Sequence, residues 1–112
     1  MKTASLFADL DFKENKPAVS VLLQTDFTKE IRIAFKENQE LKEHKTPYPI
    51  VVEIVEGEIS FGVQNESLIL KKGDLISLKG NIPHSLTAQK ESIVRLTLSI
   101  LDSEERVKNI NK

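Results

Sequence analysis

VVEIVEGE at residues 51–58 and GDLISLKGNIPH at residues 73–84 are the two stretches that decide the fold. The first indicates a buried strand that ends in a tight turn, because a run of β-branched residues is followed by a glycine. The second indicates a turn, a short strand, a second turn and a histidine. We predict that the two stretches pair inside one small barrel. The chain has two histidines, His44 and His84, and this pairing would place both rings on the inner face.

More short strands flank this pair. Residues 18–24 are rich in strand formers, and residues 30–36 alternate charged with apolar side chains, which predicts an antiparallel hairpin. Residues 50–55 and 58–63 lie on either side of Glu56-Gly57 and give the strongest hairpin signal in the chain. The remaining predicted strands are residues 67–70, 75–78, 84–88 and 91–101, whereas the polar residues 37–45 are interpreted as a connecting segment.

About eight short strands with closely spaced turns and no long helix predict an all-β sandwich or barrel. A jelly roll is the arrangement that accommodates about eight antiparallel strands in 112 residues. We therefore expect one domain over residues 1–112, with an N-terminal arm at residues 1–16. The charged C-terminal tail, residues 102–112, is expected to form a short helix or to fray.

Composition excludes several classes of function. The formal net charge is −1 and the lysines are scattered, so a nucleic-acid-binding surface is not expected. The absence of cysteine rules out disulfides, thiolate metal sites and cysteine nucleophiles. No signal peptide or membrane-spanning stretch is apparent, so we expect a cytoplasmic protein without membrane contacts.

The motif spacing resembles that of the small single-domain cupins. Gly73-Asp74 and His84 reproduce the second cupin motif, in which a histidine follows the first glycine by eleven residues. In the first motif Gly57 is present and His44 takes the place of the first histidine. The resemblance spans roughly residues 31–100 and implies a jelly-roll barrel and a homodimer. It also implies a barrel site in which histidines and a carboxylate hold a divalent transition metal such as zinc, nickel, iron or manganese.

The first motif departs from the cupin pattern at two positions. Thr46 stands where the second histidine is expected, and Ile50 stands where the glutamate is expected. The metal ligands that the resemblance implies are therefore His44 and His84 alone, and two imidazoles hold a first-row metal weakly. A third ligand would have to come from Glu43, Glu40 or Gln39, from water, or from a carboxylate on another strand. Glu53 is a poor substitute, because it differs from Ile50 in strand parity and should face outward. In the other interpretation, the two histidines form hydrogen bonds with each other, with water or with an anionic ligand.

Four residues are predicted to contact a ligand in the barrel: Tyr48, Ile50, Val52 and His84. Isoleucine in place of glutamate makes the interior more apolar, which favours an apolar or partly aromatic ligand, unless the side chains fill the barrel. Three functions follow from these residues. They are a small-molecule-binding or sensor module, a metal-dependent cupin enzyme of dioxygenase or isomerase type, and a non-catalytic dimeric structural protein. Whether the chain is an enzyme is left open at this point.

Overall fold

The computed structural model describes residues 1–100, and these form two antiparallel sheets and no helix. The expected tail at residues 102–112 lies outside the described residues. The strands are β1 (Ala18–Gln24), β2 (Thr28–Phe35), β3 (Glu40–His44), β4 (Ile50–Glu56), β5 (Glu58–Val63), β6 (Glu66–Lys71), β7 (Leu75–Leu78), β8 (His84–Ala88) and β9 (Ser92–Ser99). The five-stranded sheet has the order β1-β2-β9-β4-β7, and the four-stranded sheet has the order β3-β8-β5-β6. The predicted all-β jelly roll is confirmed.

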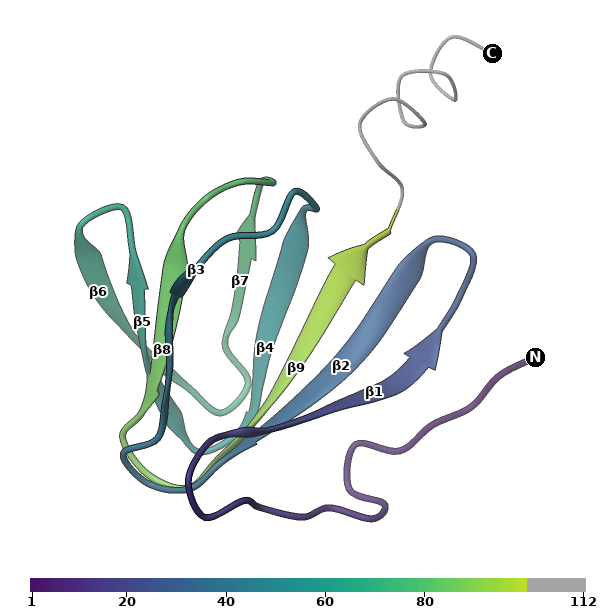
Figure 1. The fold of residues 1–112 in the computed structure, drawn as a ribbon, viewed down its shortest axis with the longest axis horizontal. Coiled ribbons are helices and arrows are strands. Elements are labelled where there is room, and N and C mark those ends of the chain that lie inside the picture. The colour runs from purple at the N-terminus through teal and green to yellow at the C-terminus, as the bar shows by residue number, and fades with distance from the viewer. Residues whose placement is uncertain (101–112) are drawn as a thin grey trace, which may run out of the picture.

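The two sheets form facing walls that lie close together at one end and diverge toward the other (Figure 1). Their inner faces follow the period of two that strands impose. In β2, for example, Ile31, Ile33 and Phe35 face the core, and the residues between them face outward. The core is formed by such inward-facing residues from both walls: Ile31, Ile33, Phe35, Ile50, Val52, Ile54, Ile59, Phe61, Val63, Leu86, Ala88 and Val94.

The pairing predicted between the two quoted stretches is confirmed. Strand β4 pairs with β7, with Val51 opposite Ser77 and Val52 opposite Ile76. The first hairpin is confirmed as well, since β1 pairs antiparallel with β2.

The hairpin predicted around Glu56-Gly57 is wrong. Strand β4 belongs to the five-stranded sheet and β5 to the four-stranded sheet, so the turn carries the chain from one wall to the other. Gly57 has a φ of +93°, and a Cβ there would lie 2.1 Å from Ser92 Oγ. The tight turn is real, but it forms a corner between sheets because both strands find other partners with buried inner faces.

The segment at residues 37–45 was also misinterpreted, because it contains β3. This strand pairs with β8 through a register shift between Leu41 and His44. Most of its side chains are exposed, so it lacks the alternation by which strands are recognised. The sequence of an irregular edge strand of this kind is easily mistaken for that of a polar loop.

The N-terminal arm crosses the outer face of the five-stranded sheet. Arg32 of β2 is buried there, and its guanidinium donates hydrogen bonds to the carbonyl oxygens of Leu6, Ala8 and Asp9. These charge-assisted bonds hold the arm against the sheet. Within residues 1–100, no helix has the length and apolar character needed to cross a membrane.

Candidate functional site

The barrel is closed at one end and open at the other. The exposed fraction of the inward-facing side chains rises toward the open end. In β2 the exposed fraction rises from 0% at Phe35 through 4% at Ile33 to 9% at Ile31. In β9, Val94 is fully buried, whereas Leu96 and Leu98 are only partly buried. The open end therefore lies where β2, β4 and β8 begin and where β3, β7 and β9 end.

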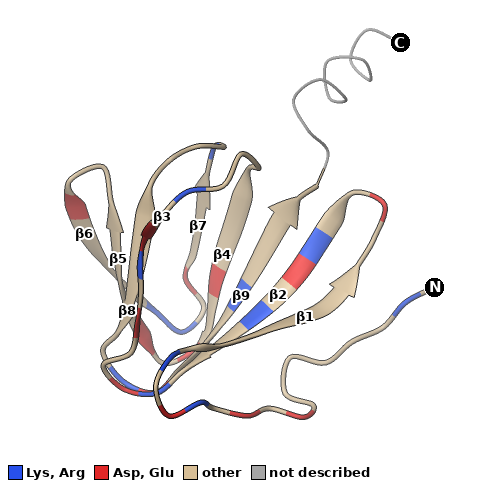
Figure 2. Ribbon diagram, viewed as in Figure 1, with Lys and Arg blue, Asp and Glu red and all other residues tan. Residues whose placement is uncertain are grey.

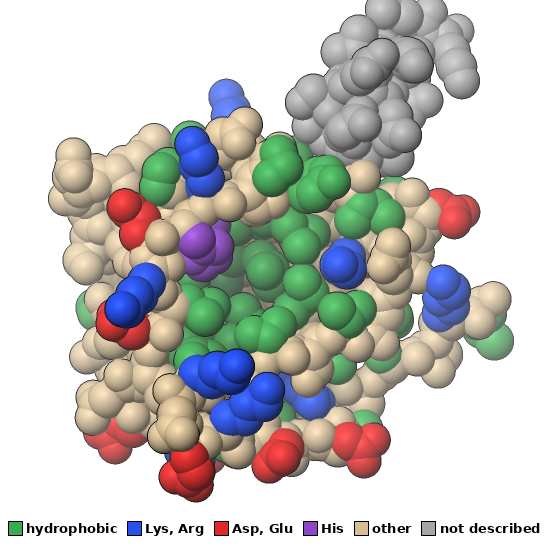
Figure 3. All heavy atoms as spheres, in the orientation of Figure 1, with side chains coloured by type: hydrophobic (Ala, Val, Ile, Leu, Met, Phe, Trp, Pro, Cys, Tyr) green, Lys and Arg blue, Asp and Glu red, His purple; other side chains and the backbone are tan. Residues whose placement is uncertain are grey.

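A hollow lined by apolar side chains opens between the diverging walls (Figure 3). Its lining agrees with the inward-facing positions near the open end, which include Ile50, Val63, Leu78, Leu96 and Leu98. A histidine lies on one wall and a basic side chain on the opposite wall (Figure 3). The barrel is therefore not completely filled, and its free space borders on apolar carbon and a few polar groups, as ligand sites commonly do.

The two histidines meet at this open end, as predicted, but the pairing that brings them together is that of β3 with β8, which the sequence analysis did not predict. His44 at the end of β3 is opposite His84 at the start of β8. Their ring centroids are 4.4 Å apart, and the ring planes are tilted by 58°. The His84 ring also stacks on Phe61 at a centroid distance of 5.7 Å. His84 is 3% exposed and His44 is exposed, so the pair spans the boundary between the core and the opening.

Backbone carbonyls fix the orientation of both rings. Nδ1 of His44 lies 2.8 Å from the carbonyl oxygen of Lys42, and Nδ1 of His84 lies 2.9 Å from that of Ile82. A carbonyl only accepts, so each Nδ1 carries the proton and donates it. In the neutral form each ring then keeps a free lone pair on Nε2. The two rings therefore offer hydrogen-bond acceptors, or metal-ligating nitrogens, to whatever enters.

Burial makes His84 harder to protonate. Loss of hydration and, to a smaller extent, the nearby His44 lower the pKa of His84 from its ordinary value of 6.5, against an opposing contribution from the Ile82 carbonyl. His84 is consequently a neutral imidazole near pH 7, and its Nε2 is an acceptor.

The four predicted ligand contacts differ in placement. Ile50 and Val52 are buried core residues of β4, on the inner face with His84. Tyr48 is partly buried in the loop between β3 and β4, and its hydroxyl makes no hydrogen bond with another residue in the described range. That loop packs against the one between β7 and β8, where a Cβ at Gly80 would lie 2.3 Å from the Pro47 carbonyl oxygen.

The donor set does not fit the metal centre that the cupin resemblance implies. Within residues 1–100 no three His, Cys, Asp or Glu side chains are grouped so that they could hold a metal ion. The residues at the two positions that depart from the cupin motif supply no replacement metal ligand. Ile50 presents hydrocarbon, and the Thr46 hydroxyl accepts a hydrogen bond from the Tyr48 amide. Two imidazoles remain, and the metal assignment of His44 and His84 stays a prediction.

The other candidate ligands considered from the sequence lie elsewhere. Gln39 bonds to the Lys36 amide and to the Lys13 carbonyl. Glu40 pairs with Thr87 across β3 and β8, and Glu43 is exposed. Glu53 faces outward, as predicted from its parity, with its carboxylate 3.8 Å from Arg95.

Sequence reasoning missed one residue at the opening, Lys29 in β2. It has the same strand parity as Ile31 and Ile33 and is opposite Leu98 of β9, so it faces the hollow from the five-stranded wall. The strand begins two residues before the predicted one, and Lys29 interrupts the charged–apolar alternation, so only counting parity back from Ile31 would have placed it on the inner face.

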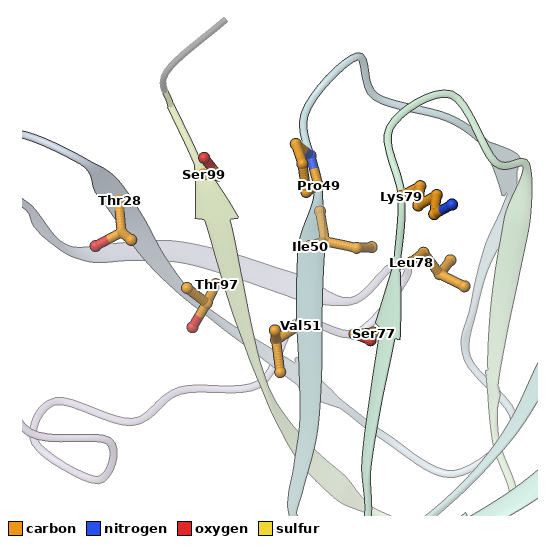
Figure 4. Close-up of a pocket in the computed structure, with 9 residues that line it drawn as sticks. All are labelled: Thr28, Pro49, Ile50, Val51, Ser77, Leu78, Lys79, Thr97 and Ser99. Atoms are coloured by element: carbon orange, nitrogen blue, oxygen red, sulfur yellow. The ribbon is translucent and has the colours of Figure 1, made fainter. Parts of the chain in front are cut away.

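A second pocket, of about 320 Å³, lies at the same end of the five-stranded sheet, partly on its outer face (Figure 4). Its lining comes from β2, β4, β7, β9 and adjoining loops: Thr28, Pro49, Ile50, Val51, Ser77, Leu78, Lys79, Thr97 and Ser99. It contains no imidazole or carboxylate, so the hollow with the histidine pair is the better candidate site.

Comparison with known proteins identifies the fold. No family model matches the chain, and no curated protein matches it in sequence. Solved structures do match. An RmlC-like cupin protein from Desulfovibrio desulfuricans is 20% identical with a TM-score of 0.81, over 88% of this chain and 96% of that one. A cupin superfamily protein from Desulfitobacterium hafniense is 15% identical with a TM-score of 0.75, over 81% and 84%.

KdgF from Halomonas sp. is 13% identical with a TM-score of 0.75, over 88% of this chain and 94% of that one. These likenesses extend over most of each chain. The chain therefore has the cupin fold, as the motif spacing predicted. At such identities the likeness concerns architecture, and function has to be argued from the site.

Proposed function

We propose that this chain binds a small, largely apolar molecule in the hollow, as a sensor or binding module that needs no metal ion. The observation that carries the proposal is the imidazole pair at the mouth of an apolar hollow. Each ring is held by a backbone carbonyl with its Nε2 free. Such an arrangement supports binding of a molecule whose apolar body contacts the partly buried Leu96 and Leu98 while a hydrogen-bond donor reaches the rings.

Filling the hollow tests this proposal. Leu96 is partly buried on the inner face, so Leu96→Trp should occupy the space a ligand needs. Ser77→Trp is the matched control, because Ser77 is exposed on the outer side of β7. Ligand-observed NMR with a panel of small aliphatic and aromatic compounds should detect binding to the wild type and to Ser77→Trp, and none to Leu96→Trp. Equal binding to both variants, or none to the wild type, would overturn the proposal.

A metal-dependent enzyme is the second candidate, and the carbonyl-held imidazoles favour it, because metal-ligating histidines commonly donate their other N–H in this way. Its test is metal analysis of protein purified without added metal and then loaded with nickel, zinc, iron or manganese. Stoichiometric metal that is lost in both His44→Ala and His84→Ala would favour the enzyme. Failure to load any of the four metals would exclude it.

A further inference from the structure

Lys29 is a cation on an apolar wall and has no anionic partner among residues 1–100. Its inward-facing neighbours along β2 are Ile31 and Ile33, and the residue opposite it on β9 is Leu98. The side chain is partly buried. It forms no hydrogen bond or salt bridge with any residue in the described range.

Within residues 1–100, Lys29 and Lys36 are the two lysines that are partly buried, and Lys36 forms a salt bridge with Glu14. Some of the more exposed basic side chains also have acidic partners. Arg95 lies 3.2 Å from Glu30, and Lys72 lies 3.1 Å from Glu56.

Figure 2 shows basic and acidic positions side by side on β2, but Glu30 faces the outer side, where it bonds to Arg95 and Thr97. On the outer face of this strand Glu30 pairs with Arg95, and the Arg32 guanidinium donates to backbone carbonyls. Within residues 1–100, the inner cation Lys29 has no such partner.

We infer that the ligand is an apolar carboxylate whose carboxylate group binds Lys29 across the hollow from the histidine pair. This inference rests on the proposed function and names the chemical class of its ligand. The inference depends on Lys29, which is on the inner wall and has no partner within residues 1–100, because transfer of a cation toward hydrocarbon is unfavourable unless an anion compensates for it.

The surroundings select a carboxylate over a more highly charged anion. One ammonium balances one negative charge, and the walls beside it are aliphatic. A phosphate would present close to two charges and favour several donors. Glu30, the neighbour of Lys29 in sequence, faces the outer side, and the other acidic residues next to the opening, Asp26, Glu43 and Glu66, are exposed. The inner wall therefore offers a carboxylate little repulsion. The opposite end of the ligand meets the Nε2 acceptors of the rings, which favours a hydroxyl group there.

Matched probe pairs test the inference. We would measure binding of 3-phenylpropionate, 3-(4-hydroxyphenyl)propionate, hexanoate and octanoate by ligand-observed NMR and titration calorimetry, each beside its primary amide. The carboxylates should bind the wild type at least about tenfold more tightly than the amides, equivalent to about 1.4 kcal/mol. 3-(4-Hydroxyphenyl)propionate should bind more tightly than 3-phenylpropionate, because its hydroxyl group can donate to the imidazole rings.

Three variants assign the preference to one residue. Lys29→Met should remove the advantage of carboxylate over amide while leaving amide binding within about twofold of wild type, because only the charge interaction is lost. Lys29→Arg should retain the preference. Lys71→Met is the control for net charge, since Lys71 is exposed on β6 and follows the inward-facing Leu70, and it should behave as the wild type.

The outcomes separate the two proposals. If amides bind as tightly as carboxylates, or if Lys29→Met keeps the preference, the anion inference is wrong and the binding function stands. If no carboxylate and no amide binds the wild type, both proposals fall. Thermal unfolding of each variant establishes that the loss of binding is not a loss of folding.

Discussion

His84 couples the stability of the protein to pH through its imidazole. The ring is 3% exposed, stacked on Phe61 and close to His44, and its pKa is lowered from 6.5 by burial first and by His44 second. The unfolded chain leaves this group in water, where it takes up a proton at its ordinary pKa. Between the two pKa values the unfolded state binds more protons, so acid favours unfolding.

We therefore predict that the free energy of unfolding falls as the pH is lowered through about 6.5 and levels off below the pKa of the folded state. Each unit by which the pKa is lowered contributes about 1.4 kcal/mol to this loss. Urea unfolding at a series of pH values measures it. His84→Gln should flatten the profile between pH 7 and 5. An unchanged slope in that variant would show that another group is responsible.

Single residues of the site differ in how far the sequence revealed them. The spacing from Gly73 to His84 placed His84 on the inner face, and its pairing with His44 is confirmed. Lys29 was missed because a lysine next to a turn is ordinarily a solvated side chain, and only the strand's true start at Thr28 gives it an inward parity. Thr46 and Ile50, the two departures from the cupin motif, were visible in the sequence, and within residues 1–100 no other side chains complete a three-ligand group.

At the scale of elements, the corner between β4 and β5 depends on Gly57. Its φ of +93° is in the left-handed region, and a Cβ would lie 2.5 Å from the Glu91 carbonyl oxygen and 2.7 Å from Ser92 Cα. Backbone atoms cannot give way as a flexible side chain can. Gly57→Ala should therefore lower the free energy of unfolding for two reasons. The left-handed backbone conformation costs about 1–2 kcal/mol with a Cβ, and the close approach adds an overpacking cost of about 1–3 kcal/mol.

Gly73 supplies a matched control for this prediction. Its φ is +92°, but nothing lies within 4 Å of the position a Cβ would take. Gly73→Ala should lower the free energy of unfolding by the conformational cost alone. The difference in unfolding free energy between the two variants, measured by urea unfolding, should equal the cost of the close approach at Gly57. Equal losses in both variants would contradict the steric account of this corner.

The elements that the sequence mispredicted share a physical reason. A turn of two residues fixes how the chain reverses, but it does not decide whether the flanking strands hydrogen-bond to each other. In this fold β4 pairs with β7 and β9, while β5 pairs with β6 and β8. These long-range partners bury apolar faces that a hairpin alone would leave in water. Strand β3 was missed because it is set by pairing with β8 and not by its own alternation.

At the scale of the whole molecule, the sequence was sufficient to predict two sheets that enclose a core, because alternation and turn spacing are global patterns. It was not sufficient to predict whether the barrel is filled. From the sequence, Ile50, Leu96 and Leu98 could equally fill the core or line a hollow. Only the divergence of the two sheets in the structure distinguishes these alternatives. The expected cytoplasmic location stays a prediction.

The last prediction concerns assembly. The cupin resemblance implies a homodimer, and we propose that it forms through the part of the five-stranded sheet's outer face that the N-terminal arm leaves open. That part carries two exposed apolar residues, Val51 and Leu75, the second 65% exposed. Light scattering coupled to size exclusion should give twice the monomer mass for the wild type and the monomer mass for Leu75→Glu. Ile69→Glu, 51% exposed on β6 of the other sheet, should remain a dimer, because a charge disrupts only the interface in which it is buried. A wild-type monomer would refute the dimer, and dissociation by Ile69→Glu alone would place the interface on the opposite wall.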